Sequence, residues 1–372
     1  MNNTNSTPQT AFSTKAPAAI EGDQTAHLYR LWVAIGIFFL SIEAWTIYQW
    51  VTSPYFKPAS VGPDPIPADA LLHVRMIEAF SATGFLICVW FFLLSPLIKK
   101  QPLTAFGRIF IAMVTAYWMD PIYNYTNAVW YYNAYAFNMG SWASFIPGWI
   151  SPAHENFPEP LLAAGCLWFL AFGPTAKGGA WLYGKAREWF GANALIRPLA
   201  LIFVVSALFD FAFENVWIRM DVFGFQGTWS PLTLWEGTEY QFPLYEPPME
   251  ALLMTPIILL AYYRDDHGFM FCERGLHRLK VSGRVRTLLA IIATCGFAQF
   301  VCAFVWMMPF QWFATHITSN AALPSYKLGG MCGKGTAFAC PDGSFGVPTK
   351  YTTPDFIVHP DDLRLRKHQV NN

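Results

Sequence analysis

The chain has 372 residues, of which 54% are hydrophobic and only 13% are charged, and its formal net charge is zero. Soluble domains average about 25% charged residues, so this composition excludes an ordinary soluble domain and is typical of a membrane protein. The sequence contains no basic patch interleaved with aromatic residues, so we expect no nucleic-acid partner.

Residues 1–27 are polar and lack the apolar centre of a signal peptide, so we predict a disordered cytoplasmic tail. A membrane-spanning helix needs about 20 mostly apolar residues. Seven stretches are predicted as spans, the fourth of them short, and they are 29–51, 71–97, 104–123, 159–174, 196–219, 247–263 and 285–309. The predicted fold class is therefore all-α: a polytopic transmembrane bundle over residues 28–310, followed by an extracytoplasmic tail over residues 311–372.

Basic residues alternate between the predicted loops. They follow the second, fourth and sixth spans, whereas the loop 124–158 contains no Lys or Arg. Because cytoplasmic loops are enriched in Lys and Arg, the N-terminus is expected in the cytoplasm and the C-terminus outside. We therefore predict a multi-pass integral membrane protein, placed in a bacterial cytoplasmic membrane.

Two of the seven cysteines, Cys332 and Cys340, lie in the glycine-rich part of the predicted external tail. A disulfide between them would suit an oxidising compartment, and two free thiols are the alternative. Four others fall within predicted spans, where cysteine is usually a small core residue.

Acidic residues of the predicted spans gather at one depth. With the predicted orientation, five helices place acids in the outer half of the membrane, where such residues are costly and usually functional. The acids are Glu43, Glu78, Asp120, Asp210, Glu214 and Glu250. Asp210 and Glu214 are four residues apart and share a helix face. We predict that this pair forms one wall of a polar cavity.

Some of these acids also have a structural explanation. Glu78 could form an interfacial ion pair with Arg75, and Glu250 could cap the start of its helix, where a carboxylate suits the dipole. Asp120 precedes Pro121 and could satisfy backbone groups freed by a proline kink. Asp210 and Glu214 have no such local backbone role.

Polar and aromatic neighbours extend the predicted site. The residues expected to line the cavity and contact the substrate are Trp118, Tyr123, Asn124, Asn215 and Trp217, together with Glu78 and Glu250. For the aromatic residues, membership of the interfacial aromatic belt is the alternative. The external loop adds His154, Glu155 and Glu159, for which solvation in a loop is a sufficient explanation.

Several motifs of cofactor-dependent chemistry are absent from the sequence. It contains no paired helical histidines for haem, no HxxxH set for a di-iron centre, no Walker loop, no GxGxxG, no CxxC and no GxSxG. We therefore predict neither a cofactor nor a metal. The remaining chemistry is that of carboxyl groups, namely proton transfer and stabilisation of positive charge.

The multispan layout and three segments, "WMDPIYNYTN", "FPEP" and "DFAFEN", resemble the AveC-like spirocyclase family over about residues 28–320. This family is named for the enzyme that closes the spiroketal of avermectin. The resemblance implies a cofactor-independent, dehydrative cyclisation of a dihydroxy ketone. It also implies a lipophilic substrate of polyketide or isoprenoid type, which could enter from the bilayer.

Such a reaction needs an acid, a base and a group that stabilises a cation. Desolvation beside Trp217 favours the neutral form of Glu214, which we expect to be the general acid. Asp210 would then stay ionised and stabilise the cation, while Asp120, oriented by Asn124, would be the base. Glu43 is expected in the same cavity.

Two other functions remain open at this point. Acids in one layer of a helical bundle could form a proton-coupled transport path, or the chain could be an accessory subunit of an envelope complex. Transporters usually bind substrate near the midplane, in broken helices of paired repeats. Here the acids lie off-centre and no repeat is visible, which favours the cyclase. The expected partners are a lipophilic small molecule and membrane lipid, and the oligomeric state is open.

Overall fold

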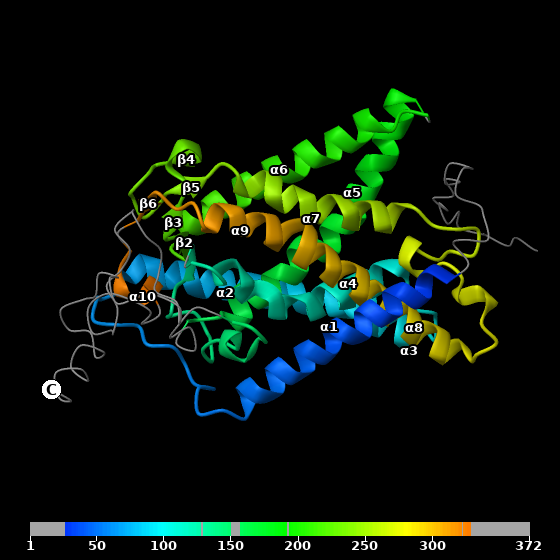
Figure 1. Ribbon diagram of the computed structural model, residues 1–372, viewed down its shortest axis with the longest axis horizontal. Coiled ribbons are helices and arrows are strands. Elements are labelled where there is room, and N and C mark those ends of the chain that lie inside the picture. The colour runs from blue at the N-terminus through cyan, green and yellow to red at the C-terminus, as the bar shows by residue number, and fades with distance from the viewer. Residues whose placement is uncertain (1–26, 128, 150–156, 192, 322, 329–372) are drawn as a thin grey trace, which may run out of the picture.

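The computed structural model describes residues 27–127, 129–149, 157–191, 193–321 and 323–328. In this part of the chain the fold is a helical bundle, as predicted (Figure 1). The predicted N-terminal tail 1–27 lies, except for His27, outside the described residues, and so do Cys332 and Cys340. The five cysteines among the described residues are buried and form no disulfide with one another.

Five helical segments of the described residues are long and apolar enough to cross a membrane. The first is α1 (Leu28–Val51). The second runs through α2 (Ala68–Val89), a π-helical turn (Trp90–Leu94) and α3 (Ser95–Ile98). The third joins a π-helical turn (Leu161–Gly165) to α5 (Cys166–Phe190), and the fourth is α6 (Ile196–Arg219). The last contains α8 (Gly283–Phe300), a π-helical turn (Val301–Met307) and α9 (Met308–Ala314).

The span that starts near Glu159 is longer than predicted. The sequence placed its end at residue 174, whereas the helix continues through Lys177 and Lys185 to Phe190. Long basic side chains can lie along a helix and place their charge at its surface, so they do not end the helix.

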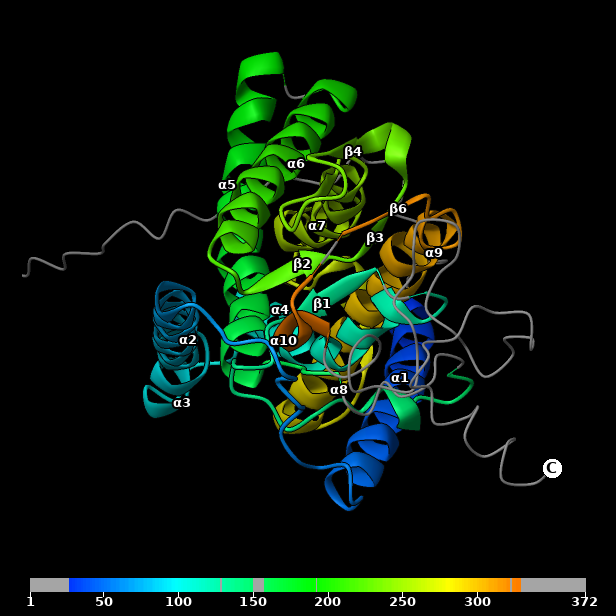
Figure 2. The same ribbon diagram turned by 90° about the vertical axis from the view of Figure 1, so that its left-hand side faces the viewer.

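Two predicted spans are short helices in the interior of the bundle. α4 (Ala105–Ala116) becomes a 3₁₀ turn (Tyr117–Asn124) that contains Pro121, and α7 is Glu246–Tyr262. Twelve of the 17 residues of α7 are buried, and α4 lies near the centre of the view along the bundle (Figure 2). The count of seven spans therefore stays a prediction, with five segments meeting the length requirement among the described residues.

Short antiparallel strands tie the loops together at one end of the bundle, at the left of Figure 1. β1 (Trp130–Tyr132) pairs with β2 (Phe223–Phe225), with Tyr131 opposite Gly224. β3 (Gly227–Thr228) pairs with β6 (Ser319–Asn320), and β4 (Thr233–Leu234) pairs with β5 (Phe242–Pro243). The sequence reading did not include these strands, because two or three residues carry no periodic pattern.

The start of the predicted C-terminal tail packs against this end. α10 (Ser325–Leu328) places the buried ammonium group of Lys327 against the carboxylate of Asp221. The Ser325 hydroxyl accepts a hydrogen bond from the Asp64 backbone N–H, at 2.9 Å. Residues 325–328 are therefore joined to loops that follow α1 and α6.

Glycine permits close contact between α1 and α8. A Cβ atom added to Gly36 would lie less than 3.0 Å from the carbonyl oxygen of Ile292, and one added to Gly296 would meet the Trp32 carbonyl as closely. Small residues let membrane helices approach backbone to backbone, where van der Waals packing stabilises the pair.

The predicted orientation can be tested by cysteine labelling. The loop after α1 contains the exposed Ser60 at the strand-bearing end, and the loop before α4 contains the exposed Gln101 at the other end (Figure 1). In a background of Cys332→Ser and Cys340→Ser, we expect Ser60→Cys to react with an impermeant maleimide in intact cells. Gln101→Cys should react only after permeabilisation, because the basic loops favour the cytoplasm. The reverse pattern would overturn the orientation.

Candidate active site

A cavity of about 90 Å³ lies between α5, α6, α7 and the 3₁₀ turn after α4, next to the β1–β2 pair. Ten of its 17 lining residues are aromatic, and four are carboxylic acids. The acids are Asp120, Asp210, Glu214 and Glu250, and the aromatic residues include Tyr123, Trp130, Tyr132 and Trp217. The acids come from three separate helical segments, so the tertiary fold assembles this cavity.

Among the described residues, the lining contains no Lys, Arg or His to neutralise the four acids. Each of the four is at most 9% exposed to solvent. Like charges crowded together away from water cannot all be ionised, and some of these groups must therefore hold protons. A site with both protonated and ionised carboxyl groups can give and accept protons at one ligand.

The α6 wall presents Asp210, Glu214 and Trp217 to the cavity from one helix face. One oxygen of each acid, Asp210 Oδ2 and Glu214 Oε2, is buried and has no hydrogen-bond partner in the part of the chain that the structure describes. Buried polar atoms nearly always have partners. These two oxygens are therefore available to a polar ligand in the cavity.

The α7 wall contributes Glu250 and, behind it, Glu246. The acid in the first turn of α7 is Glu246, so Glu250 lies one turn further in and faces the cavity instead of capping the helix. Glu246 Oε1 accepts a 2.5 Å hydrogen bond from the hydroxyl of Tyr123. The sequence reading missed Glu246, although its spacing of four from Glu250 repeats that of Asp210 and Glu214.

A second pair of acids lies at the edge of the cavity. Both oxygens of Asp120 accept from the Tyr132 hydroxyl, at 3.2 and 3.0 Å. The carboxyl group of Asp120 also lies close to that of Glu159, whose Oε1 accepts from Ser141 Oγ at 3.2 Å and whose Oε2 has no hydrogen-bond partner among the described residues. Two buried carboxyl groups this close cannot both be ionised, so one of them holds a proton. Because Asp120 already accepts from Tyr132, Glu159 is the better place for that proton.

The structure corrects the interpretation of Glu159. The sequence analysis explained Glu159 as a solvated loop residue, but in the structure its side chain is fully buried. The segment "FPEP" packs back on the bundle, where Pro160 forms a β-bridge with Asn138. The two prolines that flank Glu159 were the available signal, because they restrict the backbone and hold the residue between them in place.

Glu43 and Trp118 belong to a different polar network. Glu43 Oε2 accepts from Gln299 Nε2 at 3.4 Å, and Trp118 Nε1 donates to Gln299 Oε1 at 3.0 Å. Gln299 is fully buried in α8 and also donates to Thr115 Oγ1. This network links α1, α4 and α8, and neither Glu43 nor Trp118 lines the acidic cavity.

Three other predicted site residues do not line the cavity. Glu78 bonds Arg75 Nη1 at 2.5 Å and accepts from the Phe137 backbone N–H, which matches the ion-pair alternative. Asn124 Oδ1 accepts from the N–H groups of Val129 and Trp130 and so holds the turn before β1. Asn215 Oδ1 accepts from Arg219 at 3.0 Å. In the described part of the chain, no group of three or more His, Cys, Asp or Glu side chains is arranged to hold a metal ion.

A comparison of the sequence with models of known protein families finds one match. Residues 102–326 match the family described as "Spirocyclase AveC-like", and this range contains every residue that lines the cavity. Glu43 and Glu78 lie before it. No curated protein and no solved structure matches the chain.

Proposed function

The chain belongs to the AveC-like spirocyclase family, and on that premise we propose that it is a membrane-embedded cyclase. It would close rings by acid–base catalysis on a lipophilic polyketide- or isoprenoid-like substrate, as in spiroketal formation. The observation that carries this proposal is the pair of carboxyl oxygens of Asp210 and Glu214 that have no hydrogen-bond partner, in an aromatic cavity whose described lining residues include no cation. Carboxylates and aromatic faces both stabilise positive charge.

The proposed reaction starts from a dihydroxy ketone. One hydroxyl adds to the ketone to form a hemiketal, and protonation of the new hydroxyl releases water and leaves an oxocarbenium ion. The second hydroxyl attacks this carbon and loses its proton. One water is lost overall and no group changes its oxidation state, so one acid and one base suffice.

Glu214 is the proposed acid, and Asp210 the anion that stabilises the oxocarbenium ion. The two carboxyl groups are one turn apart on the same wall, beside the ring of Trp217. Trp130, Trp168 and Trp306 extend the aromatic lining around them. A cation that forms between these groups is attracted both to the anion and to the faces of the rings.

Asp120 is the proposed base, and it lines the cavity from the 3₁₀ turn after α4. Tyr132 hydrogen-bonds to its carboxylate, and in this scheme the protonated Glu159 also donates to it and positions it. The proton that Asp120 removes from the attacking hydroxyl replaces the one that Glu214 delivers. The catalyst thus returns to its starting state when protons redistribute among the neighbouring acids.

The size of the cavity supports entry from the bilayer. Ligand pockets usually measure roughly 300–1,000 Å³, so a cavity of about 90 Å³ holds only the reacting part of a large substrate. Phe209 lines the cavity and is also 43% exposed on the outer surface of α6. Displacement of this ring would open the cavity toward lipid, and the apolar remainder of the substrate would lie there.

Conversion of a synthetic keto-diol by membranes that contain the chain tests the proposal, with loss of one water followed by mass spectrometry. Glu159→Leu should slow this conversion about 10- to 100-fold, because a hydrogen bond to a charged group contributes about 1.5–3 kcal/mol. Glu159→Gln keeps a donor for Asp120 and should be affected less. Equal rates for the parent and Glu159→Leu would show that Glu159 does not position the base.

A further inference from the structure

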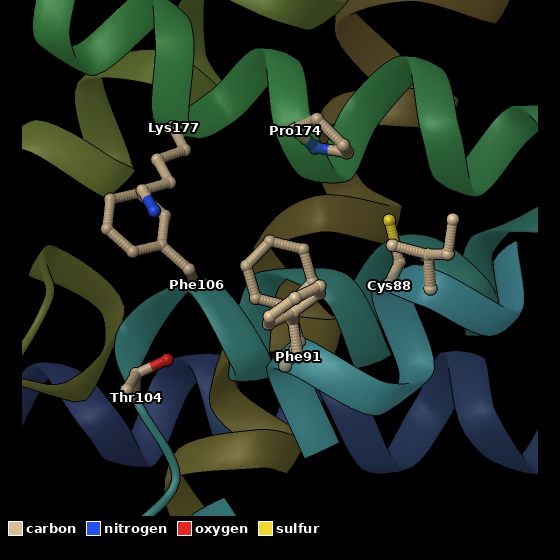
Figure 3. Close-up of a pocket in the computed structure, with 8 residues that line it drawn as sticks. Cys88, Phe91, Thr104, Phe106, Pro174 and Lys177 are labelled. Carbon is tan, nitrogen blue, oxygen red and sulfur yellow. The ribbon is translucent and has the colours of Figure 1, made fainter. Parts of the chain in front are cut away.

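A second and larger cavity, of about 430 Å³, lies away from the carboxyl groups, toward the end of the bundle that carries the basic loops. Its walls come from α2 with the following π-helical turn, from the start of α4 and from α5 (Figure 3). Ile87, Phe91, Phe92 and Phe106 make most of the surface apolar, and Lys177 supplies a cationic side chain. The lining residues that the structure describes include no carboxyl group. Nothing in the proposed reaction uses this groove.

Local irregularities in two helices form the groove. Pro174 lies within α5 and contributes to one wall. The π-helical turn Trp90–Leu94 interrupts the opposite helix, and Gly107 allows the start of α4 to approach the Phe92 carbonyl closely. π-helical turns inside α-helices are rare and are frequent at functional sites.

The groove faces the lipid along its apolar part. Ile87 is 51% exposed and Phe91 is 66% exposed, and both belong to a segment long and apolar enough to span the membrane. Lys177 lies 16 residues after Leu161, or about 24 Å along the helix, which is close to the far edge of a hydrocarbon core about 30 Å thick. The apolar surface and the cation are therefore arranged along the membrane normal.

The polar end of the groove carries one cation in its lining, Lys177, and a second behind the lining. The guanidinium group of Arg264 lies 5.1 Å from the ring centre of Phe106, and Phe106 and Lys177 line the same groove (Figure 3). The nearby Glu273 is already held by two hydrogen bonds from Arg108. Burial and, to a lesser extent, the neighbouring Arg108 lower the pKa of Arg264 from its ordinary value, and Glu273 acts in the opposite direction. An added negative charge would be stabilised here.

We propose that this groove binds an anionic phospholipid of the leaflet on the basic-loop side. The phosphate would lie between Lys177 and Arg264, and one acyl chain would follow Phe92, Phe91 and Ile87. An amphiphile of this kind matches both parts of the groove, since the apolar part opens to the bilayer and the charged part lies at its edge. A basic pocket between membrane helices is suited to an anionic headgroup.

Native mass spectrometry of the purified full-length chain can test the site, with phosphatidylglycerol and phosphatidylcholine of identical acyl chains as probes. We expect tighter binding of phosphatidylglycerol. Lys177→Gln should weaken that binding about fivefold, because a basic residue near an anionic surface contributes about 1 kcal/mol. The matched control is Lys185→Gln on the same helix, which removes a cation outside the groove that is paired with Glu188. It should leave the preference unchanged.

Three outcomes would overturn the proposal. The parent protein could bind both lipids equally, or Lys185→Gln could weaken binding as much as Lys177→Gln. Glycerol 3-phosphate could also displace phosphatidylglycerol at equal concentration, which would show that the groove holds a headgroup alone. Lys177 is exposed, so its replacement should not prevent folding.

Discussion

Replacement of Glu214 by Gln should lower the turnover of a keto-diol by about a hundredfold to ten-thousandfold, the usual contribution of an essential proton-transfer group. The amide cannot deliver a proton to the departing hydroxyl, and its shape is otherwise similar. Asp210→Asn should also lower the turnover strongly, because it removes the negative charge that stabilises the oxocarbenium ion. The rates would be measured in membranes with matched amounts of each variant.

Glu188→Gln is the control for these variants. Glu188 is an exposed acid on α5, paired with Lys185 and remote from the cavity lining, so its replacement should leave turnover unchanged. Each variant should elute as the parent does on size-exclusion chromatography. If Glu214→Gln and Asp210→Asn both turned over like the parent, the carboxyl mechanism would be wrong and the α6 pair would need a structural explanation.

Replacement of Arg108 by Met should lower the free energy of unfolding by about 3–5 kcal/mol, the usual effect of removing one partner of a buried ion pair. Arg108 donates from Nε and Nη2 to the two oxygens of Glu273, at 2.5 and 2.8 Å. Glu273 is fully buried and also accepts from Thr294. Without Arg108 the buried carboxylate of Glu273 loses both hydrogen bonds from its charged partner, and the loop 263–282 loses its ion pair with α4.

Thermal unfolding in detergent would measure this effect. Lys185→Met is the comparison, since it breaks the exposed pair with Glu188 and should cost at most about 1 kcal/mol. The double variant Arg108→Met with Glu273→Leu should recover much of the stability, because apolar residues can replace a whole buried pair. Equal losses in Arg108→Met and Lys185→Met would contradict the assigned role of the buried pair.

Hydropathy and spacing along single helices predicted the parts of the molecule that depend on neighbouring residues in the chain. The apolar stretches became helices, and the interval of four placed Asp210 and Glu214 on one face, where both line the cavity. Asp120 and Glu250 were also predicted as acids of the same layer, and the structure places them in the same cavity. Their roles in catalysis stay predictions.

Hydropathy and spacing along single helices could not predict the structure of the loops. Glu159 follows a long loop, and its burial depends on contacts with Asp120 and Ser141 that no local pattern contains. The 3₁₀ turn at Pro121 and the β1–β2 pair likewise decide where Tyr132 lies, and hence which group holds Asp120.

The sequence by itself predicted the depth of each acid along its helix, because hydropathy and the distribution of basic residues both vary along the membrane normal. Only the tertiary structure decided the direction in which each acid points around the bundle. Glu43 was predicted at the depth of the other acids, yet α1 packs on α8 and turns it toward Gln299, away from the cavity. The depth of a residue depends on the free energy of its transfer between water and lipid, and this is a property of a single helix. The direction of a side chain depends on how the helices pack, and this is decided only when the partner helices are in place.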